Sequence, residues 1–139
     1  MNAPSFLSAS LLVTLGGGLG AWLRFLTGRL WTTAIGPVAA SAFPWATLTV
    51  NVLGSFAMGL LIGWLARNTG HGVLGNEGWR LLLGVGVLGG FTTFSAFSLE
   101  VILLAERGAM AQAFGYITLS VIAGLAALVI GLTLTRAAA

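Results

Sequence analysis

The sequence predicts an all-α membrane protein that crosses the bilayer with four helices and forms a single domain over residues 1–139. Two observations carry this prediction. The chain is 58% hydrophobic and only 6% charged, whereas a soluble domain carries about 25% charged residues because its surface faces water. Charged residues also divide the chain into four uncharged stretches, and each is close to the roughly 20 residues that span a bilayer core.

The expected spans follow from the positions of these charges. No basic residue precedes the first apolar run, and Arg24 and Arg29 follow it, so we expect a retained helix over residues 5–28 rather than a cleaved signal peptide. The other spans are expected over residues 44–66, 80–105 and 109–135. Residues 29–44 and 67–79 are expected as connections, the first rich in small residues and the second rich in glycine.

The third span contains the segment "GGFTTFSAFSLE", residues Gly89–Glu100. Adjacent glycines weaken a helix, and the hydroxyls of Thr92, Thr93 and Ser95 can satisfy backbone groups that lose helical partners. We therefore predict that the third helix is broken near mid-membrane. Two interpretations remain open: the break forms an ion site lined by backbone groups, or the glycines make a kink that lets helices cross closely.

Small residues four apart occur in every span, and in lipid this spacing marks faces where helices pack closely. The arginines on the two predicted sides of the membrane number three against three, because Arg67, Arg80 and Arg136 fall on one side and Arg24, Arg29 and Arg107 on the other. Such a balance gives no strong orientation. It favours insertion both ways and an antiparallel homodimer, although one fixed orientation remains an open alternative.

The lining expected inside the spans is neutral. None of the four apolar stretches contains Asp, Glu, His or Lys, and Glu100 lies at the trailing edge of the third. Because pumps that couple to protons bury an ionisable group, this pattern favours an uncharged solute or an anion. Phe91, Phe94 and Phe97 are spaced three apart, and two interpretations stay open: plain packing, or rings presented edge-on whose partial positive charge suits an anion.

The chain resembles the CrcB/Fluc family of fluoride ion channels. The resemblance is carried by "GGFTTFSAFSLE" together with "GGGLGAWLRF" at Gly16–Phe25, "TLTVNVLGSFAMG" at Thr47–Gly59 and "YITLS" at Tyr116–Ser120. It covers all four spans in order. It implies a non-enzymatic, dual-topology antiparallel homodimer in the bacterial cytoplasmic membrane, which passively exports toxic fluoride through two pathways.

The resemblance also implies roles for particular residues. The fluoride path would be lined by Phe94, Phe97, Asn51, Tyr116, Ser120 and Thr47. A structural Na⁺ at the dimer centre would be held by the backbone carbonyls of Gly89 and Thr92 from both subunits. Arg24, Glu100 and Ser95 are expected at the pore vestibule or the subunit interface, although Arg24 could equally be an interfacial snorkelling residue and Glu100 a helix-end charge.

One position departs from the family pattern, because Gly124 stands where some members carry another hydroxyl one turn beyond Ser120. Water or a neighbouring threonine could replace that hydroxyl.

Two other classes of function stay open. A small multidrug exporter is also a four-helix dimer but needs a carboxylate in its first span, which has none. An accessory subunit of a larger complex would explain the small-residue faces without transport. The chain has no cysteine, and its net charge of +3 is too scattered for a nucleic-acid partner.

Overall fold

A computed structural model describes residues 4–68 and 74–137, and these residues form helices without any strand. The elements in chain order are α1 (Phe6–Ala42), α2 (Trp45–Arg67), α3 (Gly75–Trp79), the π-helical η1 (Arg80–Leu88), α4 (Gly89–Phe91), α5 (Phe94–Glu106) and α6 (Met110–Ala137). Four stretches are long and apolar enough to cross a membrane, namely α1, α2, Gly75–Glu106 and α6. Part of the expected connection 67–79, including His71, lies outside the described residues.

Helix α1 is longer than the sequence predicts. Residues 29–42, expected as a connection, are helical, with a kink at Gly36 (φ +82°) directly before Pro37. The left-handed conformation of Gly36 is one that favours glycine, and proline is well accommodated at the first position of a new helical segment. Arg24 and Arg29 therefore lie within a helix and not in a loop. The extension is fastened to α2 by Trp31, whose Nε1 donates to the Thr49 hydroxyl at 3.0 Å.

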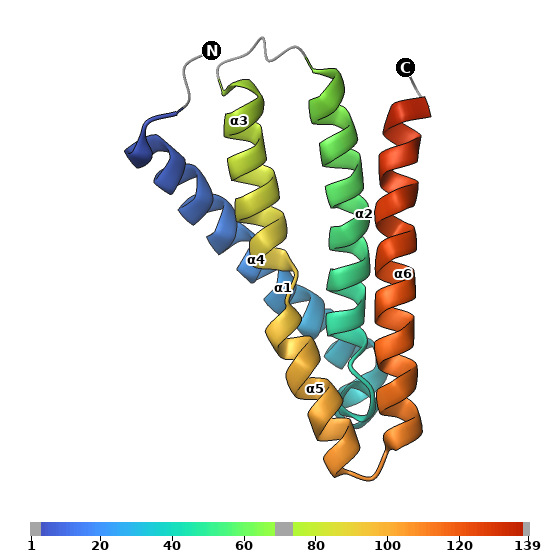
Figure 1. The fold of residues 1–139 in the computed structure, drawn as a ribbon. Helices are drawn as coiled ribbons and strands as arrows, with labels where there is room; N and C mark the ends of the chain where they lie inside the picture. The colour runs from blue at the N-terminus through green and yellow to red at the C-terminus, as the bar shows by residue number, and fades with distance from the viewer. Residues whose placement is uncertain (1–3, 69–73, 138–139) are drawn as a thin grey trace.

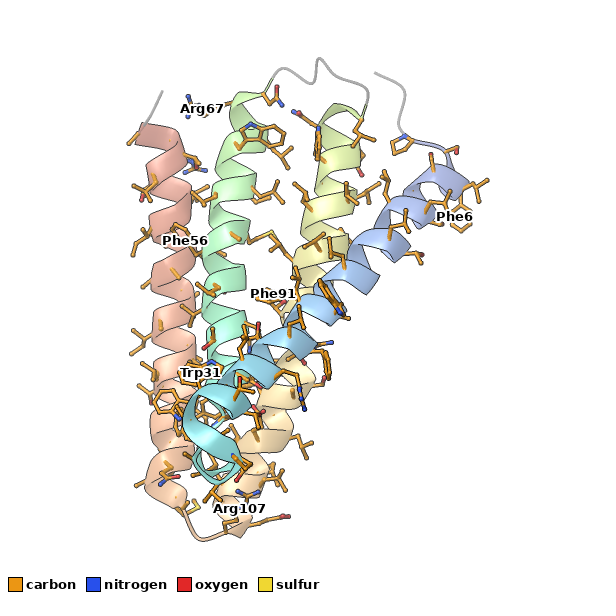
Figure 2. All side chains as sticks on the ribbon, turned by 180° about the vertical axis from the view of Figure 1, so that it is seen from behind. Phe6, Trp31, Phe56, Arg67, Phe91 and Arg107 are labelled. Atoms are coloured by element: carbon orange, nitrogen blue, oxygen red, sulfur yellow. The ribbon has the colours of Figure 1, made fainter. Side chains whose placement is uncertain are left out.

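The most extensive helix contacts join α2 to α6 and join α1 to η1 and α4 (Figure 1). Helices α2 and α6 run side by side along their length, and α1 crosses obliquely against η1 and α4. Arg67 and Arg107 lie at opposite ends of the molecule, with Phe91 about halfway between them (Figure 2). Many large apolar side chains are exposed along α1 and α6. Such a surface suits lipid or another protein chain rather than water.

Glycines make these close contacts possible. A Cβ added to Gly20 would collide with the Val87 carbonyl, and one added to Gly90 with the Gly17 carbonyl. On the other side of the bundle, a Cβ on Gly59 would collide with the Leu128 carbonyl. The prediction that small residues four apart mark contact faces is confirmed for these faces, and the contacts join helices of the same chain.

The third stretch is interrupted just after Phe91. Thr92 (φ −84°, ψ 158°) and Thr93 (φ −153°, ψ 121°) are extended, and α5 begins at Phe94. Gly89 keeps helical angles, and α4 includes Gly90. The expectation that these glycines unwind is therefore wrong, because Gly90 instead lets α1 approach closely. The interruption also places Phe91 in α4, so the three phenylalanines do not share one helix.

Candidate functional site

Asn51 of α2 is joined to the interruption by a reciprocal pair of hydrogen bonds. Its Nδ2 donates to the Thr93 carbonyl at 3.0 Å, and its Oδ1 accepts from the Thr93 backbone N–H at 2.8 Å. Because one side-chain amide satisfies both backbone groups of the same extended residue, the pair holds the interruption against α2. An amide nitrogen carries two donors, so a second N–H of Asn51 remains after the bond to Thr93.

The interruption also leaves backbone carbonyls without their helical donors. In a continuous helix the N–H of Thr93 would donate to the Gly89 carbonyl, and that of Ala96 to the Thr92 carbonyl. Here the Thr93 N–H donates to Asn51, and the Ala96 N–H donates to the Thr93 hydroxyl at 3.2 Å. The two carbonyls that the family resemblance assigns to Na⁺ are thus among the four, Gly89 to Thr92, that have no helical donor at the interruption.

Carbonyl oxygens are ligands that hard cations accept, so the Gly89 and Thr92 carbonyls fit such an ion chemically. No group of three or more Asp, Glu, His or Cys residues gathers to hold a metal elsewhere in ranges 4–68 and 74–137. A side-chain donor also approaches the Thr92 carbonyl, because Nη1 of Arg24 lies 3.4 Å from it. The Arg24 guanidinium therefore lies against the interruption in this chain.

Glu100 lies inside the bundle, where two hydroxyls hold its carboxylate. Thr47 of α2 donates to Oε1 at 2.7 Å, and Tyr116 of α6 donates to Oε2 at 2.8 Å. Tyr116 is completely buried and Thr47 is 7% exposed. Helix α5 continues for six residues beyond Glu100 to Glu106, so Glu100 is not a helix-end charge. Thr47, Glu100 and Tyr116 come from three different spans and form one hydrogen-bonded group.

Aromatic rings connect this group to the interruption. The rings of Phe94 and Phe97 lie 5.6 Å apart, and those of Phe97 and Tyr116 lie 5.1 Å apart, both with tilted planes. On its other side, Tyr116 packs edge-on against Phe43 at 5.5 Å. Phe97 is packed against the buried cluster that contains Tyr116, whereas Phe94 is 79% exposed in the single chain.

Ser120 and Ser95 take different positions. Ser120 lies one turn beyond Tyr116 on α6, and its Oγ is buried without a hydrogen-bond partner in the described part of the chain. A buried hydroxyl without a partner is costly, so this donor is suited to a water molecule or an ion. Ser95 is exposed, and its hydroxyl lies 3.2 Å from that of Thr93, which caps α5.

Two cavities adjoin these residues. The larger, about 320 Å³, is lined by Asn51, Ser55, Gly89, Thr92, Phe94 and others, and we name it the Asn51 cavity. The second, about 200 Å³, is lined by Ser41, Phe43, Glu100, Arg107 and others, and we name it the Glu100 cavity. Phe94 and Glu100 are six residues apart on α5, which is about 9 Å along a helix. Ring contacts from Phe94 to Phe97 and Tyr116, and the bond from Tyr116 to Glu100, connect residues that line the two cavities.

Two residues of this site were not assigned from the sequence. Thr93 was expected only to satisfy backbone groups, which it does, but its partnership with Asn51 was not predicted. A threonine directly before an apolar helical run is a typical helix cap, and this signal could have placed the start of α5. Phe43 carried no signal, because its contact with Tyr116 depends on where α1 ends.

The fold and site together define a class: a protein of four membrane-length helical stretches that enclose neutral polar side chains, aromatic rings and one hydrogen-bonded carboxylate. Within this class the chain belongs to the CrcB family, because the family described as "CrcB-like protein, Camphor Resistance (CrcB)" matches residues 11–132. The resemblance read from the sequence motifs is thereby confirmed.

Relatives of this chain carry a functional name. The fluoride-specific ion channel FluC of Novosphingobium aromaticivorans is 53% identical over 133 residues, which cover 96% of this chain and 100% of that protein. FluC of Erythrobacter litoralis is 55% identical over 130 residues, or 94% of this chain and 93% of that protein. FluC of Caulobacter vibrioides is 48% identical over 126 residues, or 91% of this chain and 94% of that protein. Ion channels are not enzymes, and the family is therefore a non-enzymatic class.

Proposed function

We propose that the protein is a fluoride-specific ion channel that passively exports fluoride across the bacterial cytoplasmic membrane. The proposal rests on the family, on relatives named fluoride-specific channels that match nearly the whole chain, and on a row of neutral donors and aromatic rings between two cavities. Passive flow needs no catalytic group and no proton-coupling step.

The observation that carries the proposal is the donor set around Glu100. Thr47 and Tyr116 direct two hydroxyl donors at a carboxylate inside the bundle. Both hydroxyls donate to acceptor oxygens of Glu100, and fluoride, which also accepts hydrogen bonds, can use these donors where Glu100 releases them. The unpartnered hydroxyl of Ser120 lies one turn further along α6. Fluoride gives up tightly held water only where fixed donors replace it, and Asn, Ser, Thr and Tyr side chains supply such donors without trapping the ion on a positive charge.

In this proposal fluoride passes from the Asn51 cavity along the ring edges of Phe94 and Phe97 and then to Tyr116. The second N–H of Asn51 donates at the start of the path, and the positive edges of the two rings contact the ion where no hydroxyl is available. Phe97 lies against Tyr116, so the ring and hydroxyl contacts are continuous. Glu100 and Thr47 define the far end, beside the Glu100 cavity.

The proposed active unit is an antiparallel homodimer with two such paths. Phe94 is 79% exposed in one chain and lines a cavity that one chain leaves open, and a second copy would cover both. The arginine tally is three against two once Arg24, which lies against the interruption, is set aside. This is still close to the balance that permits insertion in both orientations.

A structural Na⁺ is proposed at the two-fold axis of this dimer. The Gly89 and Thr92 carbonyls, which have lost their helical donors, would hold the ion from both subunits, and the ion would supply fixed positive charge at the dimer centre. Within each chain, Asn51 and the Thr93 hydroxyl keep these carbonyls available by binding the N–H groups that would otherwise reach them.

Flux from reconstituted liposomes tests the function. We expect fluoride efflux on a fluoride electrode when the membrane potential is clamped with valinomycin and potassium, and no comparable chloride efflux. Absence of fluoride efflux at any protein density would refute the proposal. Proton-coupled uptake of an aromatic cation would indicate a multidrug exporter, and inactivity in both assays would indicate an accessory subunit. Labelling of a C-terminal tag from both sides of intact cells tests the dual topology.

A further inference from the structure

Where α2 packs against α6, the hydroxyl of Ser55 lies next to the proposed path. Ser55 lies one turn beyond Asn51 on α2, and Gly124 lies one turn beyond Ser120 on α6. A Cβ placed on Gly124 would lie 3.6 Å from Ser55 Oγ, which is an ordinary contact distance. The position on α6 that lacks a side chain is therefore adjacent to a hydroxyl from α2.

The Ser55 hydroxyl is available for a ligand. Serine and threonine hydroxyls within helices usually donate to a carbonyl one turn earlier, as Thr27 and Thr32 do at 3.0 and 2.9 Å. Ser55 makes no hydrogen bond to any residue in the described ranges, although the Asn51 carbonyl lies one turn before it. Among the described Ser and Thr residues that are not exposed, only Ser55 and Ser120 share this condition.

Ser55 also faces the cavity in which the proposed fluoride path begins. It lines the Asn51 cavity together with Asn51, Phe94 and Leu128. Asn51, Phe94 and Ser55 thus line one cavity, and Gly124 of α6 lies next to the Ser55 hydroxyl. An anion in this cavity can be reached by the Ser55 hydroxyl without displacing an internal hydrogen bond.

We propose that Ser55 is a fluoride-contacting residue, which supplies from α2 the hydroxyl that Gly124 does not supply from α6. This inference rests on the proposed function and adds a residue to the path. It extends the path by one turn: the donors run from Ser55, which is level with Gly124, to Asn51 on α2 and Ser120 on α6 and then toward Tyr116. Because only the position of the hydroxyl matters, an equivalent hydroxyl placed at residue 124 can replace it.

The test is a hydroxyl exchange measured as fluoride efflux from liposomes at equal protein density. Ser55→Ala removes the donor and is expected to lower the efflux rate about 10-fold, in line with the loss of one hydrogen bond to a charged group. Ser55→Thr keeps a hydroxyl and is expected to stay within about 3-fold of wild type. The double variant Ser55→Ala/Gly124→Ser is expected to recover most of the rate, because the new hydroxyl enters the space that Ser55 vacates.

The matched control is Ser55→Ala/Gly124→Ala, which adds the same Cβ without a hydroxyl and is expected to remain as slow as Ser55→Ala. Size-exclusion chromatography reports the assembly of every variant. A Ser55→Ala rate equal to wild type overturns the inference, as does a loss that the alanine control restores equally well. A wild-type protein without fluoride efflux overturns the proposed function and this inference together, whereas an active wild type with an unaffected Ser55→Ala variant overturns only the inference.

Discussion

The substitution Asn51→Asp keeps one of the two hydrogen bonds that Asn51 makes with Thr93 and removes the other. The aspartate can still accept the Thr93 N–H, which lies 2.8 Å from Oδ1. It cannot donate to the Thr93 carbonyl, which lies 3.0 Å from Nδ2. When ionised, it places a negative oxygen against that carbonyl and next to the cavity in which we place the fluoride path. The substitution therefore changes the sign of the electrostatic interaction while it keeps the shape of the side chain.

The size of the effect follows from the distances. A fluoride ion about 4 Å from the new carboxylate would be repelled by roughly 4 kcal/mol at an effective dielectric constant of about 20. Since each 1.4 kcal/mol corresponds to about tenfold in rate, the upper bound is about a thousandfold, and we expect at least a hundredfold loss of efflux. The measurement is fluoride efflux from liposomes, with the amount of folded dimer checked by size-exclusion chromatography.

Asn51→Ala is the matched control because it removes both hydrogen bonds without adding charge. Each unsatisfied group of Thr93 costs about 1–3 kcal/mol, so this variant should be less stable than Asn51→Asp in a thermal melt but should conduct better. If assembled Asn51→Asp conducts as fast as wild type, Asn51 does not face the ion. If Asn51→Ala is the slower of the two variants, the role of Asn51 is to hold the interruption, and the electrostatic reasoning is refuted.

Three further outcomes are expected. Tyr116→Phe removes one of the two donors to Glu100 and should cost about 1–3 kcal/mol of stability in a melt together with a lower efflux rate; an unchanged melt would show that this bond is not important for the fold. Gly20→Ala should lower the melting temperature and impair assembly, because the added methyl meets the backbone of η1 and overpacking costs about 1–3 kcal/mol. Gly18→Ala, which has open space, is the control and should have no effect. Exchange of Na⁺ for N-methylglucamine should lower the thermal stability of the dimer, and equal melting curves in the two salts would refute the sodium proposal.

Local patterns in the sequence were sufficient to predict the four spans and the close contacts between helices. Hydropathy and the positions of six arginines and three glutamates predict four membrane-length spans, and four such stretches are present. The small residues predict close helix contacts, which the glycine packing confirms. These features depend on composition and spacing within one helix. For the same reason the extension of α1 to Ala42 was missed, because a segment rich in alanine and threonine has no hydropathy signal that distinguishes a helix from a loop.

The tertiary structure decided which groups meet. Sequence patterns predict a break within Gly89–Thr92, but the extended conformation of Thr92 and Thr93 depends on Asn51 of another helix, which supplies the bonds that the extended backbone needs. Likewise, Glu100 reads as a charge at the end of a span, and only the packing of α2 and α6 against α5 brings Thr47 and Tyr116 to its carboxylate. The chain by itself determined four spans and the kinds of polar group they carry. The crossing of the helices decided which of those groups bind one another, because a hydrogen bond between spans depends on helix rotation and depth, and no local pattern of residues encodes either.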